Sequence, residues 1–183
     1  MEVAEQIITT NTSNIKVLKR DGRLEPLDID KIHFVVEEAC EGLTGVSSSQ
    51  IEINANIQFY DGITTKDIQH VLVKSANDLI TLENPNYQYA AARLLSYDVR
   101  KEAHGQYEYI PLLKLILRNI KLGVYDRTIV EKYHKSEIKK FNTWIKRDRD
   151  LDFTYAGLRQ VVDKYLVQDR SSGEIYETPQ DMY

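Results

Sequence analysis

The residues of this sequence best suited to chemistry are cations that could hold phosphate, and they are scattered along the chain. Lys19 and Arg20 stand beside an Asp-Gly dipeptide, Lys31 follows shortly after them, and Lys101 lies much later. Lysine and arginine bind anions, as do the unpaired N–H groups at the start of a helix, where Thr65 would also offer a hydroxyl. Taken alone, charged residues beside a turn are usually solvated. A phosphate site therefore requires that folding gather these residues.

The composition is that of a globular protein, and it excludes several classes of function. Of the 183 residues, 42% are hydrophobic and 28% are charged, and the net charge is -4. This acidic balance argues against a nucleic-acid partner, because binding a phosphate backbone needs a basic excess. Neither G-x-x-x-x-G-K-S/T nor G-x-G-x-x-G occurs, so P-loop and Rossmann sites are excluded.

Cysteine usage and hydropathy narrow the cellular setting. Cys40 is the only cysteine, so no disulfide or cysteine-ligated zinc site can form within the chain. We therefore expect a cytoplasmic protein. No apolar run approaches the roughly 18 residues of a membrane span, so we expect no membrane partner.

A flexible tail and a hairpin are predicted at the start of the chain. Residues 1–14 lack periodicity, which is typical of a mobile tail. Apolar runs at 15–18 and 24–27 flank Asp21-Gly22, a dipeptide able to adopt positive φ in a tight turn. These features predict a β-hairpin that carries the first two cations at its turn.

Helical spacing dominates the sequence after this hairpin. Asp28 is a plausible N-cap for a helix that ends near Gly42. Residues 47–59 predict a weaker helix, whose end could also be a third strand because apolar residues alternate there. The capping-box pattern at 64–67 precedes a further helix, and an Asn-Pro dipeptide begins another over 84–105.

The last part of the chain is predicted to hold shorter helices and a second hairpin. We expect amphipathic helices over 110–122, 126–133 and 136–145. The charged run Lys146–Asp150 is expected to be a solvated face of mutually paired residues. Residues 164–176 predict a hairpin around Ser-Ser-Gly, and the chain stops soon afterwards, as a piece of a longer protein would.

Three motifs give these elements a family resemblance. K-R-D-G-x-x-E-x-x-D-x-D-K-I-H begins at Lys19, F-Y-D-G-I-T-T-x-D-I begins at Phe59, and N-Y-Q-Y-A-A-A-R-L begins at Asn86. Together they resemble the ATP-cone that opens the large subunits of class I ribonucleotide reductases. Later blocks, among them K-L-G-V-Y-D and D-R-D-L-D-F-T-Y-A-G, look like the stretch that leads into the catalytic barrel of those enzymes, so the resemblance covers 15–183.

The resemblance implies a mainly α fold in several parts. Residues 15–105 would form the ATP-cone, a four-helix bundle capped by a small β-sheet that begins with the first hairpin. Residues 106–150 would be a helical connector, and 151–183 would be the start of a truncated catalytic region with a β-hairpin. This family's chemistry uses a thiyl radical and a cysteine pair. A chain with one cysteine is therefore expected to be inactive alone, although the full protein would be a ribonucleoside-diphosphate reductase.

The resemblance also implies where ATP or dATP would bind as an allosteric effector. Lys19 and Lys101 would hold phosphates, with Arg20 assisting, Thr65 nearby and Mg2+ accompanying the phosphates. Residues 25–31 would wrap the base and ribose. The expected contacts are Val17, Lys19, Arg20, Glu25, Pro26, Leu27, Asp28, Ile29, Asp30, Lys31, Ile32, Thr65, Gln69, Tyr97 and Lys101.

Some of these residues carry more specific expectations. Val17 and Ile32 would lie against the adenine. Glu25, Lys31 and Gln69 are the candidates for telling ribose from deoxyribose, since the two ligands differ by one 2′-hydroxyl.

Two acidic residues also have expected roles. Asp28, as a carboxylate, can only accept hydrogen bonds and would favour the adenine amino group. Asp67 corresponds to an acid that this family ties to the inhibitory response, and it could equally serve as a plain helix cap.

The implied task is allosteric. ATP would activate and dATP would inhibit by competing for one site, and dATP would make the cone dock on the radical-generating small subunit or on another large subunit. Two alternatives remain open. One is a cone-bearing transcriptional repressor, which the lack of a cysteine-rich zinc ribbon and the acidic balance oppose. The other is a helical interaction domain without a ligand.

Overall fold

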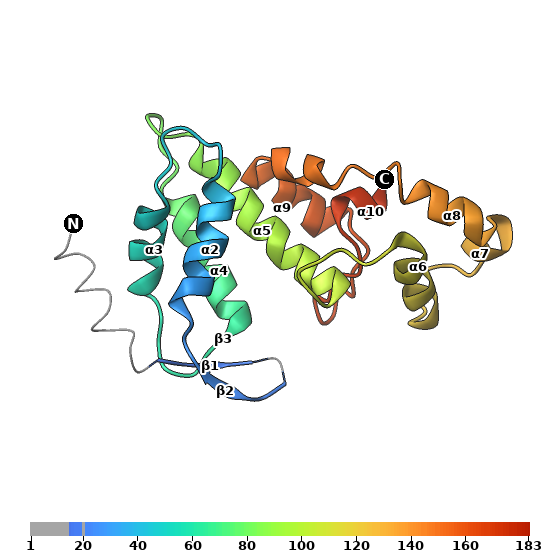
Figure 1. Ribbon diagram of the computed structural model, residues 1–183, viewed down its shortest axis with the longest axis horizontal. Coiled ribbons are helices and arrows are strands. Elements are labelled where there is room, and N and C mark those ends of the chain that lie inside the picture. Colours follow the sequence, from blue (N-terminus) through green and yellow to red (C-terminus); the bar gives the residue numbers. More distant parts are fainter. Residues whose placement is uncertain (1–14, 20) are drawn as a thin grey trace. The chain divides into compact units, whose positions relative to one another are not determined.

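The computed structural model describes residues 15–19 and 21–183, and the chain divides into two compact units (Figure 1). The first unit is Met1–Leu95 with Thr154–Ala156, and the second is Ser96–Phe153 with Gly157–Tyr183. The predicted tail at 1–14 and the predicted phosphate contact Arg20 lie outside the described residues. Helices predominate in both units, which confirms a mainly helical fold with one small sheet.

The sheet of the first unit begins with the predicted hairpin. Strand β1 (Lys16–Leu18) pairs antiparallel with β2 (Leu24–Pro26), and β3 (Ile63–Thr64) pairs in parallel with β1. The strand order is therefore β2-β1-β3. Parallel pairing needs a long connection, and here α2 and α3 supply it.

The turn of the hairpin depends on a glycine. The Lys19 N–H donates to the Arg23 carbonyl oxygen at 2.8 Å, and the Gly22 N–H donates back to the Lys19 carbonyl oxygen at 3.0 Å. Gly22 has a φ of 83°, in the left-handed region where a side chain is strained. The predicted Asp-Gly turn is thus confirmed.

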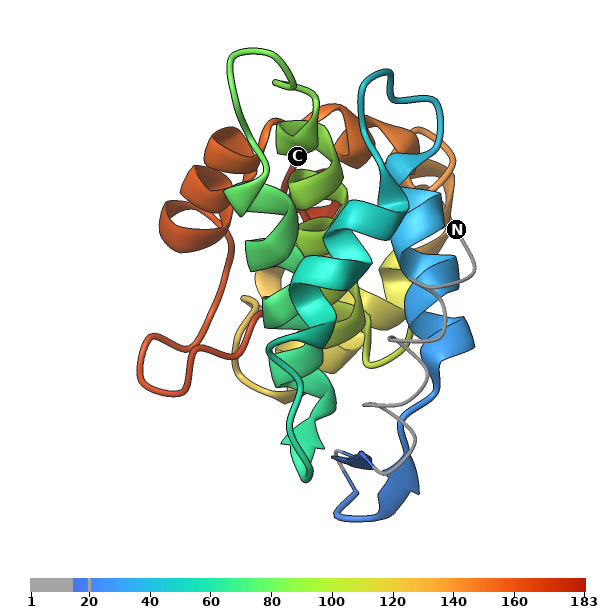
Figure 2. The same ribbon diagram turned by 90° about the vertical axis from the view of Figure 1, so that its left-hand side faces the viewer.

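Three helices of the first unit begin at capping residues, two of which, Asp28 and Thr64, were predicted. Helix α2 (Ile29–Cys40) is capped by Asp28, α3 (Ser48–Asn56) by Ser47, and α4 (Thr65–Asp78) by Thr64. Figure 2 shows these helices rising side by side from the sheet. Residues 48–56 are helical because Ile51 and Ala55, four residues apart, are the buried positions. The possible strand at the end of this segment does not form, and β3 takes its place.

The core of the first unit lies between these helices and the first half of α5 (Tyr87–His104). Buried apolar residues contributed by them include Val36, Ala39, Ile51, Ala55, Leu72, Ala76, Ala91 and Leu94. The Arg93 guanidinium donates to the Ala39 and Glu41 carbonyl oxygens at 3.2 and 2.7 Å, which satisfies the end of α2. Helix α5 starts after the predicted Asn-Pro dipeptide and ends before Gly105, as expected.

The second unit continues from α5 through shorter elements. They are α6 (Leu112–Lys121), α7 (Thr128–Lys132), α8 (Lys135–Phe141), a 3-10 helix η1 (Arg147–Asp152), α9 (Tyr155–Lys164) and α10 (Pro179–Met182). The predicted helices over 110–122, 126–133 and 136–145 correspond to α6, α7 and α8. Among the described residues, no helix has the length and apolar character needed to cross a membrane.

Two predictions for the second unit need correction. Residue 164 ends α9 rather than beginning a strand, so the expected hairpin is shorter than predicted. It consists of an antiparallel bridge between Gln168 and Ile175, flanked by the Asp169 N–H donating to the Glu174 carbonyl oxygen at 2.9 Å and the Tyr176 N–H donating to the Val167 carbonyl oxygen at 3.0 Å. The charged run 146–150 is solvated only in part, because Lys146, Asp148 and Arg149 are exposed whereas Asp150 is fully buried and Arg147 pairs with Asp181 at 2.6 Å. Charge pattern alone did not show this burial, since the partner element α10 lies far along the chain.

Candidate functional site

The predicted base and ribose residues line one depression in the first unit. Glu25, Pro26, Leu27, Asp28, Ile29, Asp30 and Lys31 surround a volume of about 640 Å³ where β2 leads into α2. A volume of this size falls in the range of small-molecule sites. The depression is large enough for a nucleoside.

The sheet places Lys19 beside this depression. Val17 lies opposite Glu25 in the hairpin, and Lys19 is two residues beyond Val17, so the three side chains share one face of the sheet. The Lys19 ammonium lies 3.3 Å from a Glu25 carboxylate oxygen. Val17 itself is only 3% exposed, which leaves little of its side chain for direct contact with a base.

The parallel strand pair places the start of α4 beside Lys19 as well. Leu18 lies opposite Thr64 in the register of β1 and β3. Because parallel strands run in the same direction, the next residues along each chain, Lys19 and Thr65, leave the sheet at the same edge. The backbone at Lys19 therefore lies near the start of a 14-residue helix, whose first N–H groups and dipole favour an anion.

Asp28 already has structural partners, and they leave it some acceptor capacity. One carboxylate oxygen accepts the Lys31 N–H at 3.1 Å, and the other lies 2.8 Å from the Lys31 ammonium. These bonds from Lys31 lower the pKa of Asp28, and the charge of Lys19 lowers it further. An ionised carboxylate has about four lone-pair positions, so capping α2 does not prevent Asp28 from accepting an amino group.

Gln69 and Ile32 lie on the helices behind the depression. The Gln69 side-chain amide donates to the Leu94 carbonyl oxygen at 2.8 Å and so ties α4 to α5. Ile32 is half-buried on α2. Neither side chain lines the depression itself.

Tyr97 and Lys101 belong to the second unit. Tyr97 is 5% exposed, with its ring 5.8 Å from the Tyr107 ring and 5.0 Å from the Arg100 guanidinium. Lys101 is exposed in the last turn of α5. The assignment of both residues to the nucleotide therefore stays a prediction.

Asp67 stabilises the start of α4. The Thr64 hydroxyl donates to the Asp67 carboxylate at 2.7 Å, and the Asp67 N–H donates to the Thr64 hydroxyl oxygen at 3.0 Å. The capping role is thus confirmed. Asp67 also places a carboxylate in the first turn of α4, the helix whose N-terminus would face the phosphates.

Arg23 is a basic residue of this site that the sequence analysis missed. Its guanidinium lies 2.8 Å from Asp21 and 3.2 Å from Glu25. Glu25 is thereby held between Lys19 and Arg23. The clue available in the sequence was its position two residues before Glu25 on the predicted strand, which places both side chains on one face.

Comparison with known proteins supports this assignment of the first unit. Residues 15–102 match the model of the ATP cone domain. The chain is 47% identical over 170 residues to ribonucleoside-diphosphate reductase 1 subunit alpha of Escherichia coli K12, 93% of this chain and 22% of that protein. It is 42% identical over 168 residues to the alpha subunit of Enterobacteria phage T4, and 38% identical over 169 residues to that of Helicobacter pylori.

The match covers only part of these relatives. The chain spans 22% of the length of the Escherichia coli and phage T4 alpha subunits and 21% of the Helicobacter pylori one. The predicted family resemblance is confirmed for this N-terminal region.

Proposed function

Since this chain carries an ATP cone domain at 15–102 and matches the N-terminal region of ribonucleoside-diphosphate reductase alpha subunits, we propose that it binds ATP or dATP and thereby regulates a reductase. The observation that carries the proposal is the parallel pairing of β1 with β3. This pairing brings the end of β1, which Lys19 follows, beside the start of α4, and Glu25, the ion-pair partner of Lys19, lines the depression.

The site offers a separate group to each part of the nucleotide. Phosphates would lie between the Lys19 ammonium, the Thr65 hydroxyl and the first N–H groups of α4. The base and ribose would lie in the depression, where Asp28 would accept the adenine amino group. Lys101 would add a second cation, and Mg2+ would accompany the phosphates and offset their charge.

The regulatory step follows from two ligands competing for one site. ATP and dATP differ at the 2′-hydroxyl, so a difference in effect needs groups near the ribose, for which Glu25, Lys31 and Gln69 are the candidates. By linkage, dATP inhibits only as far as it binds the inhibited state more tightly, a coupling of roughly 1–3 kcal/mol in typical systems.

In the longer protein this region would control assembly. The four helices α2–α5 would form the bundle of the cone, residues 106–150 the connector, and 151–183 the approach to the catalytic part. The partners would be the small, radical-generating subunit and further copies of the large subunit, in the cytoplasm. The reduction of ribonucleotides would take place beyond this chain, because one cysteine cannot supply the thiols that the reaction needs.

Calorimetric titration with MgATP and MgdATP tests the proposal. Lys19→Ala should weaken both ligands by about tenfold or more, since a charge-assisted bond to phosphate contributes roughly 1.5–3 kcal/mol. Lys101→Ala should weaken them similarly. The matched control is Lys16→Ala, because Lys16 is exposed on the other face of β1. The nucleotide affinity of this variant should stay within about twofold of the wild-type value.

Two results would reject the proposal in different ways. Wild-type protein that shows neither heat nor a thermal shift at millimolar nucleotide would favour the ligand-free interaction domain. If the wild type binds nucleotide saturably and neither Lys19→Ala nor Lys101→Ala changes the affinity, the assignment of these two lysines to the phosphates would be rejected.

A further inference from the structure

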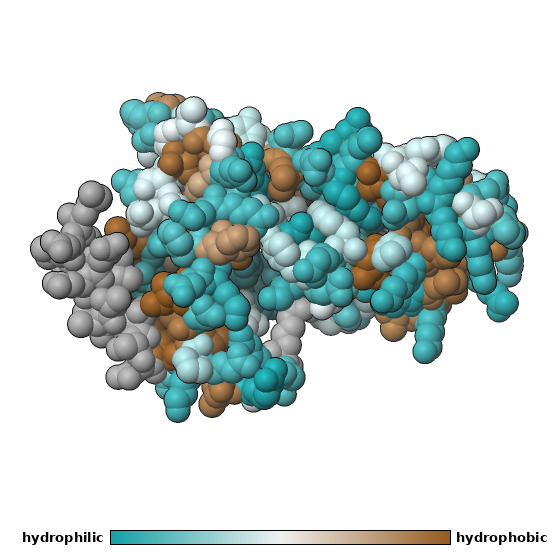
Figure 3. All heavy atoms as spheres, viewed as in Figure 1, coloured by the Kyte–Doolittle hydropathy of each residue, from teal (hydrophilic) through white to brown (hydrophobic). Residues whose placement is uncertain are grey.

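One face of α6, in the second unit, is left uncovered and forms a groove beside α8. Leu112, Leu115, Ile116 and Asn119 are the buried residues of α6. The opposite side of the helix, together with Lys139 of α8, lines an open groove of about 580 Å³. Figure 3 shows apolar side chains exposed among hydrophilic ones where α6 lies in Figure 1.

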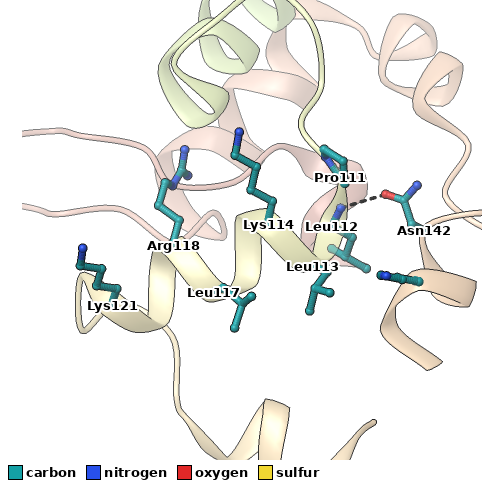
Figure 4. Close-up of a pocket in the computed structure, with 9 residues that line it drawn as sticks. Pro111, Leu112, Leu113, Lys114, Leu117, Arg118, Lys121 and Asn142 are labelled. Atoms are coloured by element: carbon teal, nitrogen blue, oxygen red, sulfur yellow. Dashed lines mark hydrogen bonds between the residues drawn. The ribbon is translucent and has the colours of Figure 1, made fainter. Parts of the chain in front are cut away.

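The groove combines an apolar row with a cationic row. Leu113 and Leu117, four residues apart, form the first row, and Leu117 is 42% exposed. Lys114, Arg118 and Lys121, at positions i, i+4 and i+7, form the second row. Figure 4 shows the leucines leaving one side of α6 and the cations the other. From 113 to 121 the helix rises about 12 Å, a little over two turns.

The positive charge of this groove is not balanced by the part of the chain that the structure describes. No aspartate or glutamate lines it. The Arg118 guanidinium donates only to neutral oxygens, among them the Ala103 carbonyl at 2.6 Å and the Asn119 side chain at 3.0 Å. Within the described residues, Lys114, Lys121 and Lys139 form no recorded ion pair with a carboxylate.

The geometry points to a docking site for an acidic amphipathic helix of a partner protein. Such a helix would lay two apolar side chains, four residues apart, on Leu113 and Leu117. Carboxylates at i, i+4 and i+7 would meet Lys114, Arg118 and Lys121. Charge complementarity selects this partner, since a groove with cations along its whole length repels basic segments and attracts acidic ones.

The rigidity of the groove supports a preformed site. Ile116, Leu112 and Ile138 form a buried cluster beneath it. The Leu112 N–H donates to the Asn142 side-chain oxygen at 2.9 Å, which joins the start of α6 to the end of α8 (Figure 4). A partner helix would therefore meet a surface that needs little ordering on binding, which reduces the entropic cost.

The test uses a synthetic helical peptide as the probe. A fluorescein-labelled peptide of alanine, leucine and glutamate, with leucines four apart and glutamates at i, i+4 and i+7, is titrated with the chain, and anisotropy is read at low and physiological salt. Matched probes replace every glutamate with glutamine or with lysine. We expect saturable binding of the glutamate peptide alone, weakened by salt.

Protein variants locate the binding. The double variant Lys114→Glu, Lys121→Glu should bind the glutamate peptide about tenfold more weakly and should gain affinity for the lysine peptide. The control double variant Lys135→Glu, Lys164→Glu makes the same change in net charge at exposed residues that do not line the groove, and it should bind as wild type does.

Further variants test the apolar row. Leu117→Ser should weaken the glutamate peptide severalfold, whereas Leu122→Ser, at an exposed leucine outside the groove, should not. Circular dichroism confirms that each variant folds. Equal binding of the glutamate peptide by wild type and by the double variant Lys114→Glu, Lys121→Glu would overturn the proposal.

Two other occupants are distinguished by the same reagents. If light scattering shows that the wild-type chain self-associates and that the double variant Lys114→Glu, Lys121→Glu does not, the groove would be assigned to a second copy. Loss of peptide binding in the full-length alpha subunit would assign it to a later segment of the same polypeptide. Either result would overturn the partner helix as the occupant, and nucleotide titration would still test the cone separately.

Discussion

Asp150 makes the stability of this chain depend on pH in an unusual direction. Its carboxylate is fully buried in η1. Burial raises the pKa of Asp150 from 3.8 to about 7, and the Asp181 carboxylate adds to the rise, whereas hydrogen bonds from Gln180 and the charge of Arg147 oppose it. The folded state therefore binds a proton that the unfolded chain releases.

The size of the effect follows from this pKa difference. A rise of about three pKa units corresponds to about 4 kcal/mol of stability, fully present below pH 3.8 and lost as pH rises through 7. Between pH 5 and pH 8 the loss is about 2–3 kcal/mol. Asp181 acts oppositely and in another window. Although burial opposes it, bonding to His104 and the charge of Arg147 lower the pKa of Asp181 to about 2, so its contribution is lost only as pH falls below 3.8.

The substitution Asp150→Asn removes the titrating group while keeping the side-chain shape. Urea unfolding followed by circular dichroism at pH 5, 6, 7 and 8 gives the free energy of unfolding of both proteins. The variant should gain about 2–3 kcal/mol relative to wild type from pH 5 to pH 8, whatever its offset at pH 5. Asp148→Asn, at an exposed neighbour in η1, should leave the slope unchanged. Parallel stability curves for wild type and Asp150→Asn would refute the reasoning.

Three further outcomes are expected for the first unit. Thr64→Ala should cost about 1 kcal/mol of unfolding free energy and weaken ATP in calorimetry, because it frees the start of α4. The control Thr81→Ala removes a similar hydrogen bond, from the Asn84 N–H at 3.0 Å in an exposed loop, and should leave ATP affinity unchanged. Gly22→Ala should destabilise the hairpin by about 1 kcal/mol in thermal unfolding, and a neutral result would contradict its φ of 83°. Leu72→Ala should cost about 2–5 kcal/mol, since Leu72 is 1% exposed, whereas Leu82→Ala, at 96% exposed, should change unfolding by less than about 0.5 kcal/mol.

The elements that could be predicted from sequence are those fixed by local interactions. Asp28 and Thr64 cap the helices that follow them. Gly22 closes the turn. The helical spacing of apolar residues in α4 and in α5 predicted both helices. Each of these features involves residues within a few positions of one another, which is what periodicity and capping patterns report.

The features that the sequence did not reveal join residues far apart in the chain. The parallel register of Leu18 with Thr64 depends on a crossover through two helices. The burial of Asp150 depends on α10, where Asp181 also binds Arg147. Local composition describes Lys146–Asp150 as a solvated run, because nothing within it shows that a distant helix will cover one of its carboxylates.

The family motif predicts the residues of the site, and the structure adds a reason why Lys19 could change partners. Its ion pair with Glu25 is partly exposed, with side-chain exposures of 29% and 38%, and such pairs contribute about 0–1 kcal/mol. A phosphate bonded to the same ammonium and to the N-terminus of α4 contributes more. A nucleotide bound as proposed would therefore displace Glu25 at little cost. Arg23, 3.2 Å from Glu25, would remain to neutralise the carboxylate that would otherwise repel the phosphates.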